Sequence, residues 1–316
     1  MKSIQLLIRT MGVIFVIVFL FLTWNWFNKE ELVSHLRTLA HHPMWLIFMF
    51  AVYYFSFVLK AAAWRMYEGT GERLQLYIHG MMYSLLVNHV SPLKIGDIVR
   101  TGFMMKTARK SWDQAFHSVA VMRLLDLLVL GVFAGVGILW IGLSSSWLWM
   151  SVITAAALLL FIGYRIPAVK RWPFIRKHLT TINAVMLSPK GYFIVALITA
   201  SWILEAAVIY GVAHILSIQI GIASLVWANS ITIAGQVFHI TPGGIGTYES
   251  TLSGSLYLLG VSWKEAYAAA FLSHTFKFAF SYAAGGYSLI RMPIRLREIK
   301  TWITQRKLPE KGMEHS

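Results

Sequence analysis

Six apolar runs in the sequence approach the length of a membrane-spanning helix. A helix needs about 20 predominantly apolar residues to cross the hydrocarbon core of a bilayer. The runs lie at residues 6–27, 44–63, 117–142, 147–164, 191–216 and 266–290. Backbone polar groups cannot stay unpaired in lipid, so segments of this kind cross as helices. The sequence therefore predicts an all-α, polytopic membrane protein with about six full spans.

Composition and charge support this class. Of the 316 residues, 57% are hydrophobic and 13% are charged, whereas soluble domains carry about 25% charged residues. A net charge of +15 can indicate a nucleic-acid partner, but the Lys and Arg residues fall between the apolar runs. That distribution indicates membrane topology, so we expect no nucleic-acid partner. The absence of cysteine excludes disulfides and thiolate metal sites.

Two further apolar segments, 74–109 and 222–260, are interrupted by proline and glycine. The interrupting residues are Pro92 and Gly96 in the first segment, and Pro242, Gly243, Gly244 and Gly246 in the second. Proline lacks an N–H, and glycine permits left-handed turns, so neither cluster suits a regular helix. We interpret each segment as a re-entrant helical hairpin that enters the bilayer and returns to the same side.

The re-entrant interpretation gives a consistent topology. With a cytoplasmic N-terminus, the basic loops near 64–73, 102–114 and 165–190 and the basic tail from 291 all lie on the cytoplasmic side, while the outer loops carry no net charge. This is the positive-inside pattern. We therefore predict a membrane domain over 1–290 and a basic cytoplasmic tail over 291–316. The tail mixes apolar and basic residues, so it either lies on the inner leaflet or is solvated.

The two interrupted segments resemble each other in sequence. The stretch "VNHVSPLKIGDIVR" (Val87–Arg100) matches "VFHITPGGIGTYES" (Val237–Ser250) at an offset of 150, and "SWDQA" matches "SWKEA" at an offset of 151. Three full spans separate the segments, and an odd number places the second copy upside down. The sequence thus predicts an inverted-topology repeat, with copies over about 44–142 and 191–290 and a polar site where their tips meet.

A new helix is expected to begin after each tip, at about Asp97 and about Thr247. The first N–H groups of a helix are unpaired and lie at the positive end of its dipole. Two such ends near the midplane would favour an anion such as a phosphate. An ordinary capped helix, with Thr247 as the N-cap, is the alternative.

Ionisable residues inside apolar runs are candidates for function because they are costly in lipid. Arg123 and Asp126 share a helix face, either as part of a polar path or as a structural ion pair. His274 and Lys277 occupy the matching place in the second copy. Glu205 lies in the middle of a span, and we expect it to meet Lys277, Arg123 or His239. His89 and His239 stand three residues before each proline.

Three motifs resemble a known family. In order they are "NHVSPLKIGDIVR", "SVAVMRLLDLL" and "TPGGIGTYES", and they resemble the signatures of the lysylphosphatidylglycerol synthase transmembrane region, a flippase-like membrane domain of bacterial proteins. The resemblance covers nearly the whole chain. Asp97 stands where the family usually has Glu, and Met122 where an acidic residue is common. No synthase domain follows within the 316 residues, so we expect a stand-alone member that does not itself aminoacylate a lipid.

The resemblance implies translocation of a lipid with a polar head between the leaflets of a bacterial cell membrane. Matched by position, the family motifs point to Asn88, Pro92, Gly96, Asp97, Arg100, Arg123, Asp126, Glu205, Pro242, Gly243, Gly244, Gly246 and Glu249. To the substrate site the sequence as a whole assigns Asn88, His89, Pro92, Lys94, Gly96, Arg100, Arg123, His239, Pro242, Gly243, Gly244, Gly246 and Lys277. To coupling it assigns Asp97, Asp126, Glu205 and Glu249.

The leading hypothesis is a gradient-coupled flippase for a lipid whose head is anionic or contains phosphate. An ion-coupled transporter of a small soluble anion shares the same features and remains the alternative. A membrane-embedded enzyme is not favoured, because His-Glu-x-x-His is absent and the other matches are incomplete. We expect no enzymatic activity, no cofactor and no metal. A homo-oligomer is compatible with the sequence.

Overall fold

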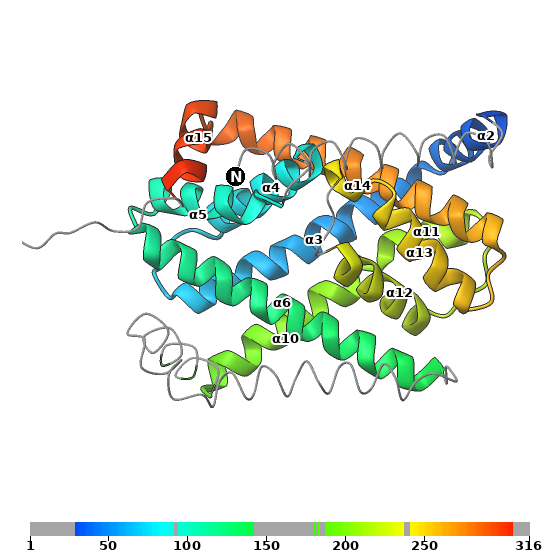
Figure 1. Cartoon of the computed structure of the whole chain (residues 1–316), viewed down its shortest axis with the longest axis horizontal. Helices are drawn as coiled ribbons and strands as arrows, with labels where there is room; N and C mark the ends of the chain where they lie inside the picture. The colour runs from blue at the N-terminus through cyan, green and yellow to red at the C-terminus, as the bar shows by residue number, and fades with distance from the viewer. Residues whose placement is uncertain are drawn as a thin grey trace, which may run out of the picture.

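Regular structure is entirely helical in the part of the chain that the computed structural model describes, namely residues 29–91, 94–141, 180, 183, 187–236 and 241–305. The helices, shown in Figure 1, are α2 (Lys29–Ala40), α3 (Pro43–Glu68), α4 (Leu74–Val90), α5 (Gly96–Thr107), α6 (Trp112–Ile141), α10 (Pro189–Glu205), α11 (Ala207–Ile215), α12 (Ile222–Gly235), the 3-10 turn η2 (Pro242–Gly244), α13 (Thr247–Leu258), α14 (Trp263–Arg291) and α15 (Leu296–Gln305).

Three stretches of described helix are long and apolar enough to cross a membrane: Pro43–Glu68, Trp112–Leu139 and Pro189–Ile215. They correspond to three of the six predicted spans. The predicted span at 266–290 lies within α14, which is 29 residues long but less apolar because it includes buried polar residues such as His274 and Lys277. The predicted spans at 6–27 and 147–164 fall outside the described residues.

Each interrupted segment forms two helices that pack against each other. In the first segment α4 ends at Val90 and α5 begins at Gly96; in the second, α12 ends at Gly235 and α13 begins at Thr247. Glycine has a conformational role at the second break, where Gly243, Gly244 and Gly246 have φ values of 62°, 79° and 84°. Residues with a Cβ adopt such values only at a cost. The sequence thus places both breaks correctly.

The helices on either side of the two breaks match in position. α5 and α13 are both 12 residues long, and α6 and α14 begin at Trp112 and Trp263, 151 residues apart. Each of these long helices starts after a serine cap: Ser111 accepts a hydrogen bond from the N–H of Gln114, and Ser262 from the N–H of Glu265. Such caps stabilise a helix start by about 1 kcal/mol. The same local signal therefore begins both helices.

Long helices join the two hairpins to each other. α6 packs against α5 of its own hairpin and α12 of the other, while α14 packs against α13 of its own hairpin and α4 of the other. α3 crosses the middle of the bundle and packs most extensively against α10 (Figure 1). This exchange of contacts brings both breaks into the centre of the bundle.

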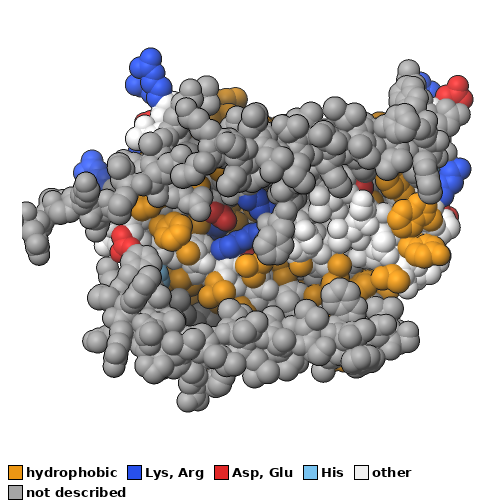
Figure 2. All heavy atoms as spheres, in the orientation of Figure 1, with side chains coloured by type: hydrophobic (Ala, Val, Ile, Leu, Met, Phe, Trp, Pro, Cys, Tyr) orange, Lys and Arg blue, Asp and Glu red, His pale blue; other side chains and the backbone are white. Residues whose placement is uncertain are grey.

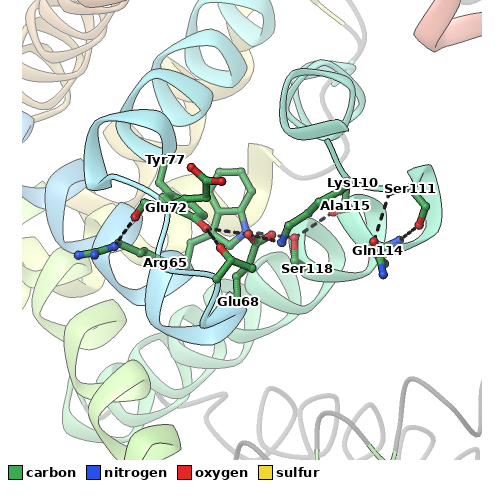
Figure 3. A network of polar contacts seen from close by, with 11 residues as sticks. Arg65, Glu68, Glu72, Tyr77, Lys110, Ser111, Gln114, Ala115 and Ser118 are labelled. Atoms are coloured by element: carbon green, nitrogen blue, oxygen red, sulfur yellow. Dashed lines mark hydrogen bonds and ion pairs between the residues drawn. The ribbon is translucent and has the colours of Figure 1, made fainter. Parts of the chain in front are cut away.

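A polar cluster closes the open end of the first hairpin (Figure 3). Glu68, at the end of α3, accepts a hydrogen bond of 2.8 Å from the Tyr77 hydroxyl of α4 and pairs with Lys110 at 2.5 Å, just before α6. The Arg65 guanidinium donates to the carbonyl of Glu72 in the same turn. The Glu68 side chain is 1% exposed, and buried charge needs such partners. The α3–α4 turn and the α5–α6 turn are therefore fixed to each other.

The described part of the tail packs on the protein. α15 lies against α5, and Trp302 is 4% exposed and contacts Gly102 so closely that a Cβ there would overlap the indole. Lys106 and Glu298 form an ion pair at 2.8 Å, and the hydrogen bond from Lys106 lowers the pKa of Glu298. The tail was predicted to lie on the lipid surface or in solvent. For the Trp302 side chain both predictions are wrong, because α5 covers it.

We predict that Gly137→Ala destabilises the contact between α6 and α12. A Cβ at Gly137 would overlap the Trp227 ring, whose indole N–H is bonded to the Ala134 carbonyl. Overpacking of this kind typically costs about 1–3 kcal/mol, and thermal unfolding of the purified protein would register it as a lower midpoint. Gly131→Ala, on the same helix with nothing within 4 Å of the added atom, is the control. Equal midpoints for the two variants would contradict the packing described.

Candidate functional site

A polar cavity of about 140 Å³ lies where the hairpins and the long helices meet. Its described lining residues are Tyr53, Phe57, Lys60, Met81, Ser84, Leu85, Asn88, His89, Lys94, Asp97, Arg100, Arg123, Asp126, Trp202, Glu205, Ile233, Gln236, Gly243, Tyr248, His274 and Lys277. All but Lys94 and Gln236, which lie in the two breaks, come from α3, α4, α5, α6, α10, α12, α13, α14 and the η2 turn. The cavity thus draws on both hairpins and on the helices that connect them.

The lining carries more positive than negative charge. Five basic side chains and three carboxylates line the cavity among the described residues, a difference of two positive charges with histidines neutral. The basic residues are Lys60, Lys94, Arg100, Arg123 and Lys277, and the carboxylates are Asp97, Asp126 and Glu205. Because the interior has a low effective dielectric, this difference favours an anionic guest.

Charged residues of the cavity differ in burial. Lys94, Asp97 and Arg123 are partly exposed, whereas Arg100 and Lys277 are buried. Figure 2 shows basic and acidic side chains together in a hollow of the face above α6, near the place where α3, α5 and α6 meet. The partly exposed residues therefore form a charged rim, and the buried ones form the interior of the cavity.

Lys60 and Glu205 form an ion pair across the α3–α10 contact. Their charged atoms are 2.8 Å apart, and both residues are at most 5% exposed. The Lys60 ammonium also lies 3.2 Å from the centre of the Trp202 ring, a cation–π contact. The partner predicted for Glu205 was Lys277, Arg123 or His239. Among the described residues the ion-pair partner is Lys60 of α3 and neither Lys277 nor Arg123, and His239 lies outside the described residues.

Arg100 presents a free edge of its guanidinium group. Its Cζ atom stacks 3.8 Å from the centre of the Trp64 ring, and its Nε and Nη2 atoms are buried with no hydrogen-bond partner among the described residues. These two atoms form one side of the planar fork, the geometry with which arginine binds a carboxylate or a phosphate through two parallel hydrogen bonds. Arg100 thus has the geometry and the unpaired donors that would suit an anion.

Other buried groups near the cavity also lack acceptors. The Asn229 Nδ2 atom and the Tyr248 hydroxyl have no hydrogen-bond partner among the described residues, and Lys277 donates to the Asn229 Oδ1 atom at 3.2 Å. Asp126, by contrast, accepts a hydrogen bond of 3.0 Å from the Trp202 indole. Unpaired buried polar groups are costly, and the unpaired groups of this region are hydrogen-bond donors. They suit a guest with several acceptor oxygens.

A histidine–glutamate pair holds the tip of the second hairpin. The His274 Nδ1 atom lies 2.7 Å from Glu249 Oε1, and its Nε2 atom lies 3.1 Å from the Gly243 carbonyl oxygen. The other oxygen of Glu249 accepts the Gly246 N–H at 2.7 Å. The Tyr248 ring stacks on His274 with centroids 4.2 Å apart. One buried cluster therefore connects α13, α14 and the tip.

Gly243 also brings the second tip against the end of α4. A Cβ on Gly243 would overlap the Phe278 ring and would lie 3.2 Å from the His89 carbonyl oxygen. His89 is three residues before Pro92, at the end of the first hairpin's leading helix. The described residues next to the two breaks are therefore in contact, which agrees with the predicted meeting of the tips.

Both helix starts are capped by side chains. Asn88 Oδ1 accepts the N–H of Gly96 at 2.9 Å, and Glu249 accepts the N–H of Gly246. Gly246, and not Thr247, is the N-cap of α13. The N–H groups of Gly96 and Gly246 are therefore paired, while the predicted unpaired N–H groups in the first turns from Asp97 and Thr247 stay a prediction. The charged side chains account for the positive charge described in the cavity.

Most of the predicted site residues line the cavity. Those that do are Asn88, His89, Lys94, Asp97, Arg100, Arg123, Asp126, Glu205, Gly243 and Lys277. The predicted residues that support it from behind are Gly96, Pro242, Gly244, Gly246 and Glu249. Gly96 packs so tightly on α4 that a Cβ would overlap the Ser84 carbonyl. Pro92 and His239 lie outside the described residues.

Sequence reasoning left Lys60, Trp202 and Tyr248 out of the site, and noted His274 without assigning it a role. Lys60 could have been found, since it is a charge within the apolar run 44–63 and obeys the rule that drew attention to Glu205. Trp202 and Tyr248 carried no such signal, because aromatic residues are common in membrane helices.

Comparison with protein families shows to which family the chain belongs. The family model described as the lysylphosphatidylglycerol synthase TM region matches residues 9–285. The chain belongs to this family. The TM-region family assignment and the long apolar helices together make it a membrane protein. Comparisons with curated proteins and with solved structures gave no match.

We predict that Lys60→Met lowers stability more than Lys60→Met combined with Glu205→Gln. The single change leaves Glu205 buried without its cation, which typically costs about 3–5 kcal/mol, whereas replacing both members of a buried pair is often close to neutral. Thermal unfolding of the purified variants measures the difference. Lys264→Met, at an exposed site on α14, serves as the control. A double variant no more stable than the single one would contradict the pairing.

Proposed function

We propose that this member of the TM-region family is a lipid flippase that moves a lipid with an anionic, phosphate-containing head between leaflets. The free edge of Arg100 in a cavity with two excess positive charges is the observation on which the proposal rests. A phosphate offers the acceptor oxygens and the negative charge that this arrangement lacks. A head aminoacylated to a net positive charge fits the cavity less well than an unmodified anionic head.

An apolar surface beside the charged rim supports a lipid as the guest. On the face of α6 next to Arg123, exposed side chains recur every fourth residue at Leu124, Leu128, Val132 and Val136, with exposures of 42%, 49%, 61% and 59%. This spacing places them in one stripe along the helix. Acyl chains can remain on such a stripe while the head enters the cavity, so the charged group avoids the hydrocarbon.

We also infer that the chain is built from two inverted copies, with hairpins that enter the bilayer from opposite sides. Support comes from the matched bounds of α5 with α13 and of α6 with α14, and from the exchanged contacts of the two long helices. Inverted repeats with broken helices at the midplane are common in transporters. The positive-inside pattern supports cytoplasmic termini, and the family resemblance supports a bacterial plasma membrane as the location.

A small soluble anion is the alternative guest, because a cavity of 140 Å³ can hold a free phosphate as well as the phosphate of a lipid head. Both guests share the chemistry of the Arg100 edge. Transport without catalysis remains the proposal, with net movement driven by a gradient and with Asp97, Asp126, Glu205 and Glu249 as candidate couplers.

We predict that Arg100→Lys slows translocation of fluorescent phosphatidylglycerol in proteoliposomes by about tenfold or more. Lysine keeps the charge but cannot form two parallel hydrogen bonds, and one lost charged hydrogen bond costs about 1.5–3 kcal/mol. Leaflet exposure of the label is read by chemical quenching from outside. Arg297→Lys, at an exposed position of α15, should retain the wild-type rate.

Uptake of labelled inorganic phosphate into the same proteoliposomes separates the two guests. Lipid translocation without phosphate uptake supports the flippase, and phosphate uptake without lipid translocation supports the solute transporter. Wild-type protein that accelerates neither movement above protein-free liposomes would contradict both.

A further inference from the structure

We propose that the His274–Glu249 pair is a proton-binding site and that its proton fastens the second hairpin tip, so that the coupling ion of transport is H⁺. This inference rests on the proposed function for its transport readout. Its structural basis is separate: both ring nitrogens of His274 face hydrogen-bond acceptors, namely the Glu249 carboxylate at 2.7 Å and the Gly243 carbonyl at 3.1 Å.

For both contacts of His274 to be hydrogen bonds, the pair must hold a particular number of protons. A carbonyl oxygen can only accept, so the bond to Gly243 requires a proton on Nε2. A second proton must lie between Nδ1 and Glu249 Oε1, on one atom or the other. The remaining Glu249 oxygen already accepts the Gly246 N–H at 2.7 Å. The closed arrangement thus contains two protons on the pair, and the pair is neutral overall.

Loss of one proton to water in the cavity breaks a contact with the tip. A neutral imidazole has a single N–H, which then faces two acceptors. The carboxylate is the stronger acceptor, so the proton stays on Nδ1 and the bond from Nε2 to the Gly243 carbonyl is lost. No other atom changes its covalent partner in this step. Proton release therefore frees the tip, and proton binding fastens it.

The position of the tip makes this bond relevant to the path. Gly243 lines the cavity and contacts the His89 carbonyl of α4 and the Phe278 ring of α14. Movement of this turn would separate the second hairpin from the end of the first and enlarge the cavity. His274 lines the cavity, so the proton that the pair releases passes to water there, although His274 and Glu249 are only 2% and 4% exposed.

Other titratable groups surround the pair on several helices. Tyr248 of α13 stacks on His274, and the His89 ring of α4 has its centre 6.4 Å from that of His274. Lys277, one turn further along α14, lies 5.0 Å from the centre of the Tyr248 ring. Tyr53 of α3 and Glu205 of α10 line the same cavity. None of these groups donates to the Gly243 carbonyl among the described contacts, which singles out His274 as the group that holds the tip.

Glu249→Gln removes the proton that the pair can release but keeps the hydrogen bonds that hold the tip. The glutamine oxygen can accept the Gly246 N–H, and its amide can donate to Nδ1, so a neutral His274 still donates from Nε2 to Gly243. Every hydrogen bond is kept, but the pair has no proton to release. We predict wild-type thermal stability, a rate of lipid translocation reduced by about tenfold or more because the tip stays closed, and no response to an imposed pH gradient. Glu265→Gln, exposed at the start of α14, should respond as wild type does.

The experiment measures translocation of fluorescent phosphatidylglycerol in proteoliposomes with and without a pH gradient, for wild type and both variants. A gradient response in wild type and Glu265→Gln that disappears in Glu249→Gln supports the proposal. The same response in Glu249→Gln, or no response in wild type that does translocate lipid, overturns it. Wild type that translocates no lipid refutes the proposed function and leaves the proton site to a second measurement.

Hydrogen–deuterium exchange provides that measurement without transport. In the wild-type protein, exchange of residues 241–246 should increase with pH more steeply than exchange of α12, whose hydrogen bonds do not involve the pair. Because the intrinsic exchange rate rises equally with pH in both segments, the ratio of their measured exchange rates reports opening of the tip. A ratio that stays constant from acidic to alkaline pH overturns the proton site, whether or not lipid is moved.

Discussion

Charge buried between helices is the constraint on which this structure depends. Lys60 and Glu205 meet at the crossing of α3 with α10, the most extensive helix contact in the described bundle. Neither group could remain in an apolar interior alone, since an unpaired buried charge costs several kcal/mol. Their ion pair bridges the crossing of the two helices, and the cavity lies beside that crossing. The polar site and the central packing contact are therefore one feature.

Close packing at two glycines completes the arrangement around the buried ion pair. Gly243 fits between Phe278 and the end of α4, and Gly96 fits against Ser84. At both places a methyl group would overlap its neighbour, so packing requires both glycines, and Gly243 also has a φ of 62°. The two breaks can then meet in the interior, where side chains of Asn88 and Glu249 satisfy the N–H groups that the breaks expose. Inside a membrane, irregular backbone is tolerated only where it is buried in protein or lines a polar cavity.

Sequence reasoning anticipated the positions of the breaks and about half of the described residues around the cavity, because both follow from local signals. Pro242 and its glycines cannot continue a helix, and a charge such as Asp126 inside an apolar run requires a polar environment. The partners of these charges were harder to predict. Lys60 is 145 residues from Glu205, and only the crossing angle of two helices decides which cation faces the carboxylate. The capping of Gly246 by Glu249 was missed for a different reason. An argument from the helix dipole does not reveal whether a nearby side chain already accepts a hydrogen bond from the N–H.

The two halves of the bundle differ at their outer ends in spite of their matched helix bounds. In the second half, α13 leads directly into α14. In the first half, α15 covers α5, and Trp302 of α15 fills the surface above Gly102. The contact between Gly102 and Trp302 thus joins α15 to the first hairpin. A spectroscopic label placed on α15 would read the position of α5 from the far end of the chain, and a purification tag that pulls α15 away would disturb the hairpin it was meant to leave alone.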